Sequence, residues 1–166
     1  MLHIRSLLAD DLPAVLTLQA QCYGDGLPES GESLAAKRAA SPDTCFLACD
    51  PDGAALAYLF SLPWRTGSLP PHNAPACALP ASPDCIYLHD LAVSPAARGS
   101  GAAGLMVARF FTAARALALP QACLVAVQAS APFWARHGFA VVDDPALRPA
   151  SLASYGEAAR YMARLL

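Results

Sequence analysis

The sequence predicts a mixed α+β fold, in which a central mixed sheet of about seven strands is flanked by about four helices. Three observations lead to this expectation. The length of 166 residues fits one domain, which we expect to span residues 1–166. Hydrophobic residues make up 55% of the chain and charged residues 14%, a composition that excludes intrinsic disorder. Strand-like and helical patterns alternate in an order that favours antiparallel strands in the first half and one parallel β-α-β crossover in the second.

The first half of the chain carries strand and helix patterns with clear boundary signals. In chain order, we expect a strand over residues 2–5, a helix that ends near Tyr23, a weaker helix over 29–40, and strands over 45–48 and 54–62. Asp10 or Asp11 is a capping residue for the first helix, and Pro13 fits its first turn. The last two strands form a hairpin, because Asp50-Pro51-Asp52-Gly53 is a turn sequence in which proline fixes φ and glycine allows a positive φ.

A proline-rich stretch separates the two halves. Residues 63–83 contain six prolines without a regular period, which indicates a long surface loop. Beyond it we expect a strand over 85–93, helices over 101–119 and 130–137, and strands over 124–127, 139–142 and 158–165. The strand over 85–93 is apolar almost throughout, as expected for a strand that is covered on both faces. The helical spacing of Val107, Phe110 and Ala114 supports the longer helix.

Charge and cysteine content exclude several classes of function. The formal net charge of −2 leaves no basic surplus with which to grip nucleic acid. The six cysteines form no C-x-x-C pair and the four histidines are scattered, so we expect no metal site. Arg109 and Arg115 interrupt the most apolar stretch, which excludes a membrane span, and Asp10 and Asp11 come too early for a signal peptide. We therefore expect a cytoplasmic protein with reduced thiols and no membrane partner.

The segment from Val93 to Gly104 carries the clearest functional signal. It lies between the apolar strand and the strong helix, and its glycines allow backbone N–H groups to turn toward one point at the helix N-terminus. Such a loop holds a phosphate or pyrophosphate, to which Arg98 adds a charge-assisted hydrogen bond. Gly99-x-Gly101-x-x-Gly104 also matches the pattern of a dinucleotide-binding oxidoreductase. That alternative requires an acidic residue about 20 positions further on, whereas the next acidic residue here is Asp143.

Three motifs, taken in order, resemble the GNAT N-acetyltransferase superfamily. Arg98-x-x-Gly101-x-Ala103 satisfies its acetyl-CoA motif Q/R-x-x-G-x-G/A, Leu91 to Pro95 looks like the end of its fourth strand, and Phe133 to Phe139 resembles its aromatic-rich fourth helix. The resemblance covers most of the chain and implies a GNAT-type sheet that binds acetyl-CoA as cosubstrate between its fourth and fifth strands. The residues that it assigns to the cofactor are Leu91, Ala92, Val93, Arg98, Gly99, Ser100, Gly101, Ala102, Ala103, Gly104, Phe133 and Trp134.

His89 and Asp90 are the candidate catalytic residues. Both are polar side chains inside an otherwise apolar strand. The surrounding sequence is similar to that of polyamine acetyltransferases, in which two adjacent acids at these positions help to bind or deprotonate the amine. Strand alternation sends the two side chains to opposite faces unless a bulge intervenes. We favour His89 as the base because histidine titrates near neutrality. The alternative is that both residues only hydrogen-bond neighbouring loops.

The resemblance does not identify the general acid that would protonate the sulfur of CoA, nor the acceptor of the acetyl group. Many relatives place a tyrosine after the phenylalanine of the fourth helix to protonate the sulfur of CoA, whereas this chain has Trp134. Tyr155, Tyr87 or water could replace that tyrosine, or the thiolate could leave unassisted. The segments expected to line the acceptor site are 23–33, 64–83 and 145–156, which contain Glu29, Glu32, Trp64, Arg65, His72 and Tyr155. These side chains could receive either a cationic amine or a carboxylate.

The activity implied by the resemblance is transfer of an acetyl group from acetyl-CoA to a primary amine of a small molecule or peptide by direct attack. The alternative is a non-catalytic acyl-CoA-binding or regulatory domain, which the missing tyrosine keeps open. The resemblance also allows a homodimer, because many relatives are dimers.

Overall fold

The structure, a computed structural model, describes residues 1–26 and 28–166 and is built on one sheet of seven strands. In chain order the strands are β1 (His3–Ser6), β2 (Phe46–Cys49), β3 (Ala55–Trp64), β4 (Cys85–Val93), β5 (Gln121–Ala126), β6 (Ala140–Val141) and β7 (Arg160–Leu165). The helices are α1 (Leu12–Tyr23), α2 (Gly31–Ala40), α3 (Ala102–Ala116), α4 (Ala131–Arg136) and α5 (Pro149–Ala153).

The strand order and pairing show the expected mixture of directions. The order is β1-β2-β3-β4-β5-β7-β6, and the pairs from β1 to β4 are antiparallel. β4 and β5 pair in parallel, and α3 connects them in a single β-α-β crossover. β7 then pairs antiparallel with both β5 and β6. The predicted mixed α+β fold, with an antiparallel first half and one parallel crossover, is therefore confirmed.

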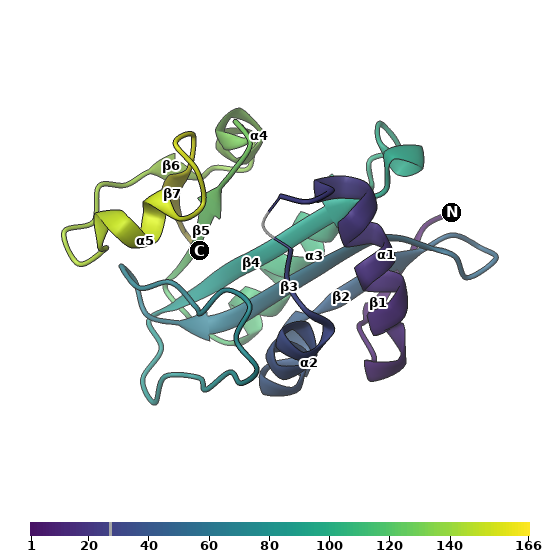
Figure 1. The fold of residues 1–166 in the computed structure, drawn as a ribbon, viewed down its shortest axis with the longest axis horizontal. Coiled ribbons are helices and arrows are strands. Elements are labelled where there is room, and N and C mark those ends of the chain that lie inside the picture. Colours follow the sequence, from purple (N-terminus) through teal and green to yellow (C-terminus); the bar gives the residue numbers. More distant parts are fainter. Residues whose placement is uncertain (27) are drawn as a thin grey trace.

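Helices cover both faces of the sheet. Figure 1 shows α1 and α2 in front of the sheet and α3 behind it. Behind the sheet, Phe110 of α3 packs in one core with Leu88 of β4. In front, Leu18 of α1 and Leu34 of α2 pack in a second core with Phe60 of β3. β3 thus serves both cores through its alternating side chains, with Leu59 in the first and Phe60 in the second. Among the described residues, no helix combines the length and apolar character that crossing a membrane requires.

Local geometry explains where two helices differ from expectation. α2 begins at Gly31 rather than at residue 29, because the Ser30 side chain accepts a hydrogen bond from the N–H of Ser33 and so caps the helix. α3 ends at Ala116 rather than at residue 119. Ala118 has a positive φ of 54°, a left-handed conformation that cannot continue the helix.

Two further expectations are corrected. The Asp11 side chain does not cap α1: it accepts a hydrogen bond from the Leu8 N–H at 2.7 Å and pairs with Arg5 at 2.6 Å, and so stabilises a 3-10 turn before the helix. α5 lies within residues 145–156, where no helix was expected, so the described residues form five α-helices. Pro149 stands at the start of α5, where its fixed φ is compatible with a helix.

β4 and β5 separate before either strand ends. They pair only over Ile86–Leu88 and Ala122–Leu124, although β4 continues to Val93 and β5 to Ala126. Along its other edge, β4 remains paired with β3. Backbone groups of β4 beyond residue 88 therefore face β5 without being used in a ladder with it, and the functional residues gather at this opening.

Candidate functional site

Two cavities meet where β4 and β5 separate. The β4–β5 cleft has a volume of about 270 Å³ and is lined by β4, by β5, by α4 and by the segment between β5 and α4. The Glu29 pocket has a volume of about 260 Å³ and is lined by α1, by β4 and by segments that carry Glu29, His72 and Tyr155. The residues that line both cavities are Tyr23, His89, Asp90, Val125, Val127 and Gln128. These shared residues form a junction between the two cavities.

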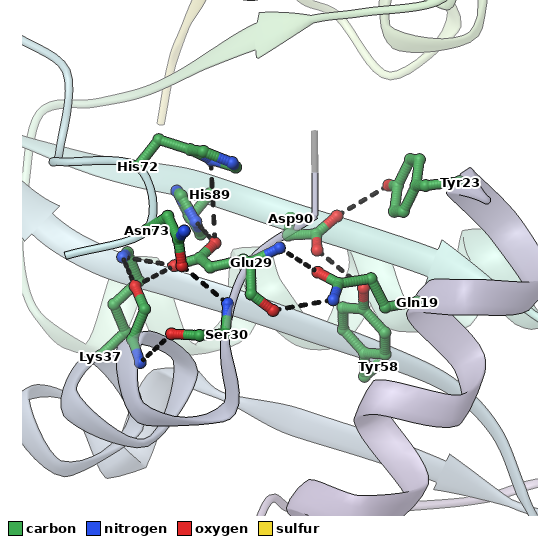
Figure 2. Close-up of polar contacts among 11 residues, drawn as sticks. Gln19, Tyr23, Glu29, Ser30, Lys37, Tyr58, His72, Asn73, His89 and Asp90 are labelled. Atoms are coloured by element: carbon green, nitrogen blue, oxygen red, sulfur yellow. Dashed lines mark hydrogen bonds and ion pairs between the residues drawn. The ribbon is translucent and has the colours of Figure 1, made fainter. Parts of the chain in front are cut away.

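A β-bulge in β4 places His89 and Asp90 at this junction. The register of the β3–β4 ladder shifts between Phe60 and Ser61, so that His89 has no opposite residue on β3. The extra residue interrupts the alternation of the strand. The prediction that the two side chains lie on opposite faces is therefore wrong. Both point to the face that α1 and α2 cover, as Figure 2 shows.

Asp90 is half-buried and accepts hydrogen bonds from two tyrosines. The hydroxyl of Tyr23 on α1 donates to its Oδ1 at 2.7 Å, and the hydroxyl of Tyr58 on β3 donates to its Oδ2 at 2.8 Å. Burial raises the pKa of Asp90, although His89 and the two hydroxyls act in the opposite direction. Burial and the charge of Asp90 also raise the pKa of both tyrosines, which therefore remain protonated donors at neutral pH.

Glu29 is the centre of a second buried network (Figure 2). Its Oε1 lies 2.6 Å from Nε2 of His89, and its Oε2 accepts hydrogen bonds from Ser33 at 2.6 Å and from Lys37 at 2.5 Å. Burial alone would raise the pKa of Glu29, but the His89 ring and the hydrogen bonds from Lys37 and Ser33 outweigh burial and lower this pKa to about 2. Glu29 is therefore ionised at neutral pH.

Two amide side chains hold the segment that carries Glu29. The Gln19 amide donates to the Glu29 carbonyl at 2.9 Å and accepts from the Glu29 N–H at 3.2 Å. Asn73, in the long loop between β3 and β4, accepts a hydrogen bond from the Ser30 N–H at 2.8 Å. This contact docks the loop against the start of α2 and brings Nδ1 of His72 to 4.0 Å from Oε1 of Glu29. The proline-rich loop thus forms part of the wall of the Glu29 pocket.

Three polar atoms around the Glu29 pocket are buried without a partner. Nε2 of His72, Nδ1 of His89 and the hydroxyl of Tyr155 make no hydrogen bond within the described part of the chain. Leaving a buried polar atom unsatisfied is costly. These atoms therefore indicate a pocket that is completed by a polar ligand.

Glu29, His72 and His89 also lie close enough together to suggest a metal ion, since their ligand atoms are all within 4.8 Å of one another. Both oxygens of Glu29 already accept hydrogen bonds, however, and one of the donors is the ammonium of Lys37. A metal cation at Glu29 would be repelled by that positive charge. We interpret the three residues as a hydrogen-bonded network, and the absence of a metal site stays a prediction.

The β4–β5 cleft gathers many of the residues assigned to the cofactor. Those that line it are Leu91, Ala92, Val93, Arg98, Ala103, Phe133 and Trp134. The β4 residues offer backbone groups along one wall. On the other wall, the rings of Phe133 and Trp134 pack edge to face, with centroids 4.9 Å apart. The cleft therefore combines backbone hydrogen-bonding groups with an apolar surface.

The remaining cofactor candidates form the turn into α3. Gly99 and Gly101 have φ values of 79° and 86°, a left-handed conformation that favours glycine, with Ser100 between them. Gly101 is the N-cap of α3 and Ala102 is its first residue, so the N–H groups of the first turn have no acceptor within the helix. A Cβ at Gly101 or Gly104 would meet no atom within 4 Å. Open backbone donors at a helix N-terminus suit a phosphate or pyrophosphate.

Three of the residues expected at the acceptor site do line the Glu29 pocket. They are Glu29, His72 and Tyr155. The rings of His72 and Tyr155 meet edge to face with centroids 5.8 Å apart, and burial raises the pKa of Tyr155 to about 12. Tyr87 lies in the same wall, and burial raises its pKa well above the ordinary value. Leu27, in the expected segment 23–33, lies outside the described residues.

The other three acceptor candidates lie elsewhere. Glu32, Trp64 and Arg65 are not among the residues that line either cavity. The Arg65 guanidinium donates to the Ser82 carbonyl at 2.7 Å and lies 3.8 Å from the Asp84 carboxylate. Arg65 is therefore engaged within its own loop and does not present its charge to the Glu29 pocket.

Sequence reasoning missed several residues of the site. They are Gln19, Lys37, Tyr58 and Gln128. The spacing of Glu29, Ser33 and Lys37, four residues apart each time, could have identified a polar stripe on one side of the helix expected over 29–40. Nothing in the sequence indicates Gln128, which has a left-handed φ of 52° just after β5.

Known proteins resemble the chain in sequence and in fold. A sequence model of the Acetyltransferase (GNAT) family matches residues 12–139. Among solved structures, the chain is similar to Ard1 from Thermoplasma volcanium, with 14% identity, a TM-score of 0.73, and coverage of 99% of this chain and 97% of that one. It is similar to the ribosomal-protein-S18-alanine N-acetyltransferase from Escherichia coli, with 17% identity, a TM-score of 0.68, and coverage of 99% and 94%.

A further similar structure is GphF, a GNAT-like decarboxylase in complex with isobutyryl-CoA, with 17% identity, a TM-score of 0.72, and coverage of 98% of each chain. At these identities the likenesses show a shared fold. No curated protein sequence matches the chain.

Proposed function

We propose that the chain, which belongs to the Acetyltransferase (GNAT) family, transfers an acetyl group from acetyl-CoA to the primary amine of a small cationic molecule, with residues 1–166 as one catalytic domain. The observation that carries this proposal is the junction of two cavities at the bulged His89–Asp90 pair. A thioester in the β4–β5 cleft and an amine in the Glu29 pocket would meet there. Bringing two reactants together in this way is a large source of rate enhancement.

We assign CoA to the β4–β5 cleft and to the turn into α3. The unpaired edge of β4 beyond residue 88 supplies backbone partners for an extended pantetheine arm. The open turn at Gly99 to Gly104 suits the pyrophosphate, with Arg98 as a charged partner. Phe133 and Trp134 supply the apolar wall. The complex of GphF with isobutyryl-CoA supports an acyl-CoA ligand for this fold.

The charges around the Glu29 pocket favour a cationic amine over an acceptor that bears a carboxylate. Glu29 and Asp90 line the pocket, and none of the described residues that line it is an arginine or lysine. Lys37 lies behind Glu29 and is paired with it. The volume of about 260 Å³ limits the part of the acceptor that the pocket can enclose to a small group.

The reaction requires that the amine lose a proton before it can attack. The bound ammonium gives a proton to His89, directly or through a water molecule, and the neutral nitrogen attacks the thioester carbon. The N–C bond forms, the C–S bond breaks, and CoA leaves as a thiolate with the electron pair. The nitrogen then loses its second proton, which neutralises the thiolate directly or through solvent. A thiol of pKa about 8.5 is a fair leaving group, so this step needs no strong acid in place of the missing tyrosine.

The test is acetyl-CoA turnover with a panel of small amines, read as thiol release and as acetylated product by mass spectrometry. The panel pairs arylalkylamines and diamines with the α-amino acids that carry the same side chains. We expect the amines to be acetylated and the amino acids to react poorly, because a carboxylate would face Glu29 and Asp90. Preference for the amino acids would contradict the assigned acceptor class.

Ligand binding separates this proposal from a non-catalytic domain. CoA should stabilise the protein by about 2.7 kcal/mol at a hundred times its Kd, and NAD should not. CoA binding without turnover of any amine would favour an acyl-CoA-binding or regulatory domain. Stabilisation by NAD and not by CoA would contradict the assignment of the cleft.

A further inference from the structure

We infer that Glu29 is a positioning residue that holds the His89 ring with its proton on Nε2, so that Nδ1 is the atom that takes the proton from the amine, while Lys37 pairs with Glu29 and offsets its charge. The inference rests on the proposed acetyl transfer, in which His89 is the base. It assigns a function to the buried chain Lys37–Glu29–His89, which joins α2 to the bulge of β4.

The contact between Glu29 and His89 decides where the ring carries its proton. Oε1 of Glu29 and Nε2 of His89 are 2.6 Å apart, and the two side chains are only 2% and 3% exposed. An ionised carboxylate oxygen can only accept a hydrogen bond, so Nε2 must be the donor. A neutral imidazole has one donor nitrogen and one acceptor nitrogen. The acceptor lone pair is therefore on Nδ1.

Nδ1 of His89 is buried, and no polar atom of the described residues hydrogen-bonds to it. His89 lines both the β4–β5 cleft and the Glu29 pocket, so the ring lies between the sites assigned to the thioester and to the amine. An amine, or one intervening water molecule, would satisfy Nδ1 and hand it a proton.

Lys37 sets the charge that the His89 ring experiences. Its ammonium donates to Oε2 of Glu29 at 2.5 Å and to Oγ of Ser33 at 3.0 Å, and its side chain is 1% exposed. Without Lys37, a buried Glu29 anion would favour a protonated ring as its counter-ion, and a protonated ring cannot act as a base. Lys37 already pairs with that anion and so offsets part of the negative charge that the ring faces.

Other titratable groups surround Lys37, Glu29 and His89 and come from several neighbouring elements. They are Tyr23 of α1, His72 and Cys77 of the β3–β4 loop, Tyr87 and Asp90 of β4, and Tyr155 before β7. Burial raises the pKa of the three tyrosines and of Cys77, so these four groups are neutral near pH 7. Substitutions of Glu29 or Lys37 leave the hydrogen bonds of Asp90 to its two tyrosines in place. These substitutions therefore test the charges of Glu29 and Lys37 themselves.

The experiment is the pH dependence of kcat/KM, with a working amine, for the wild type, Glu29→Gln, Lys37→Met and the double variant. Removing the anion disfavours the protonated ring, so Glu29→Gln should move the acidic limb to lower pH by about one unit. Removing the cation favours the protonated ring, so Lys37→Met should move the limb to higher pH by about one unit. The double variant keeps the wild-type net charge, so its acidic limb should lie at the same pH as that of the wild type.

Two outcomes of the pH profiles would overturn the inference. One is an acidic limb that stays in place in both single variants. The other is a shift in the same direction in both, which a general loss of structure would produce. Stabilisation by CoA, which depends on the other cavity, verifies that each variant is folded.

A second measurement does not depend on turnover. The ¹⁵N NMR shifts of the His89 ring distinguish its two neutral tautomers, and we expect the proton on Nε2. A proton on Nδ1 would refute the inference even if the enzyme is active. Conversely, a wild type that acetylates no amine but carries the proton on Nε2 would refute the proposed function and support the assigned hydrogen bond.

Discussion

The two cavities are built by different means. The β4–β5 cleft is walled by neighbouring residues of β4, by the turn into α3 and by α4, so that backbone groups and apolar side chains form much of its surface. The Glu29 pocket shares a wall of β4 and β5 residues with the cleft, but its other walls come from α1, from the segment before α2, from the β3–β4 loop and from the segment before β7. Its central contact joins Glu29 to His89, 60 residues further along the chain.

This difference in construction predicts a division of function. Backbone amides at a helix N-terminus hold an anionic ligand, so changes in the cleft should alter the affinity for CoA. A buried network of charges determines which groups carry protons, so changes in the Glu29 pocket should alter the rate and its pH dependence. Variants of one cavity should therefore leave the property of the other unchanged.

The largest effect is expected at the junction, where His89→Ala removes the base. General-base catalysis typically contributes ~10²–10⁴-fold, so kcat at neutral pH should fall by that order while the Kd for CoA stays the same. Activity should partly recover at high pH, where the amine loses its proton to solvent. The measurements are kcat against pH and the Kd for CoA. His3→Ala, at an exposed position of β1, is the control and should change neither.

Asp90→Asn should act differently from His89→Ala, although both side chains lie on one face of the sheet. It removes a negative charge that faces the acceptor, so the KM for the amine should rise more than kcat falls. If Asp90→Asn removes the acidic limb and His89→Ala does not, the two roles are reversed. If neither changes the limb, the amine loses its proton before it binds, and the enzyme works by positioning alone.

The next effect is expected in the turn into α3. Gly101→Val would fill space beside the backbone donors, and we expect CoA binding to weaken by at least about a hundredfold. Because Gly101 has a φ of +86°, valine also strains the turn. Gly53→Val is a matched control, since Gly53 has a φ of +89°, an equally open Cβ position, and a place in the β2–β3 turn.

Calorimetry and thermal unfolding of both glycine variants separate strain from loss of the site. A similar loss of stability in the two, with CoA binding lost only in Gly101→Val, is the expected result. Wild-type affinity for CoA in Gly101→Val would mean that the pyrophosphate is held elsewhere.

Much of the cleft could be predicted from the sequence, because its motif residues are close together along the chain. Arg98-x-x-Gly101-x-Ala103 forms one turn, and its glycines are needed for local backbone geometry. The strand that precedes it was predicted with its observed bounds, Cys85–Val93, since a run of apolar residues between turn signals needs no tertiary information. The order of the remaining strands followed from equally local patterns.

The Glu29 pocket could not be predicted in the same way. His89 and Asp90 were expected on opposite faces because alternation is the rule for a regular strand, and no residue in the strand indicates the bulge. Glu29 could be named only as one of several polar residues near the acceptor. Its pairing with Lys37 and His89 exists only once α2 is packed against the sheet, and such long-range contacts leave little signal in a single sequence.

The ion pair in the Glu29 pocket should produce a pH-dependent contribution to stability. The pKa of Glu29 is lowered to about 2 in the folded protein, from an ordinary value of 4.5. Ionised Glu29 therefore stabilises the fold above about pH 4.5, and this contribution is lost as the pH falls toward 2. Glu29→Gln should lower the free energy of unfolding by about 1–3 kcal/mol at neutral pH and by almost nothing near pH 2, where protonated Glu29 has the shape of glutamine.

Chemical denaturation of both proteins across this pH range measures the effect. Glu32→Gln, at an exposed position three residues further on in the first turn of α2, is the matched control and should show no such trend. A difference between wild type and Glu29→Gln that stays constant from neutral pH to pH 2 would mean that the charge of Glu29 does not stabilise the fold.

The smallest effect is expected at Trp134, which lines the cleft at the position where the family resemblance led us to expect a proton donor. Its indole N–H is not a useful acid, so Trp134→Phe removes contact area and little else. Trp134 is 7% exposed and packs edge to face on Phe139, with centroids 5.7 Å apart. We therefore expect a loss of about 1 kcal/mol in stability and a change in the single-turnover rate of less than about threefold.

Trp64→Phe, outside both cavities, controls for the loss of an indole. A fall of about a hundredfold with unchanged CoA affinity would show that the indole takes part in the chemistry. Both cavities would then take part in proton transfer, and the division between a binding cavity and a proton-transfer cavity would not hold.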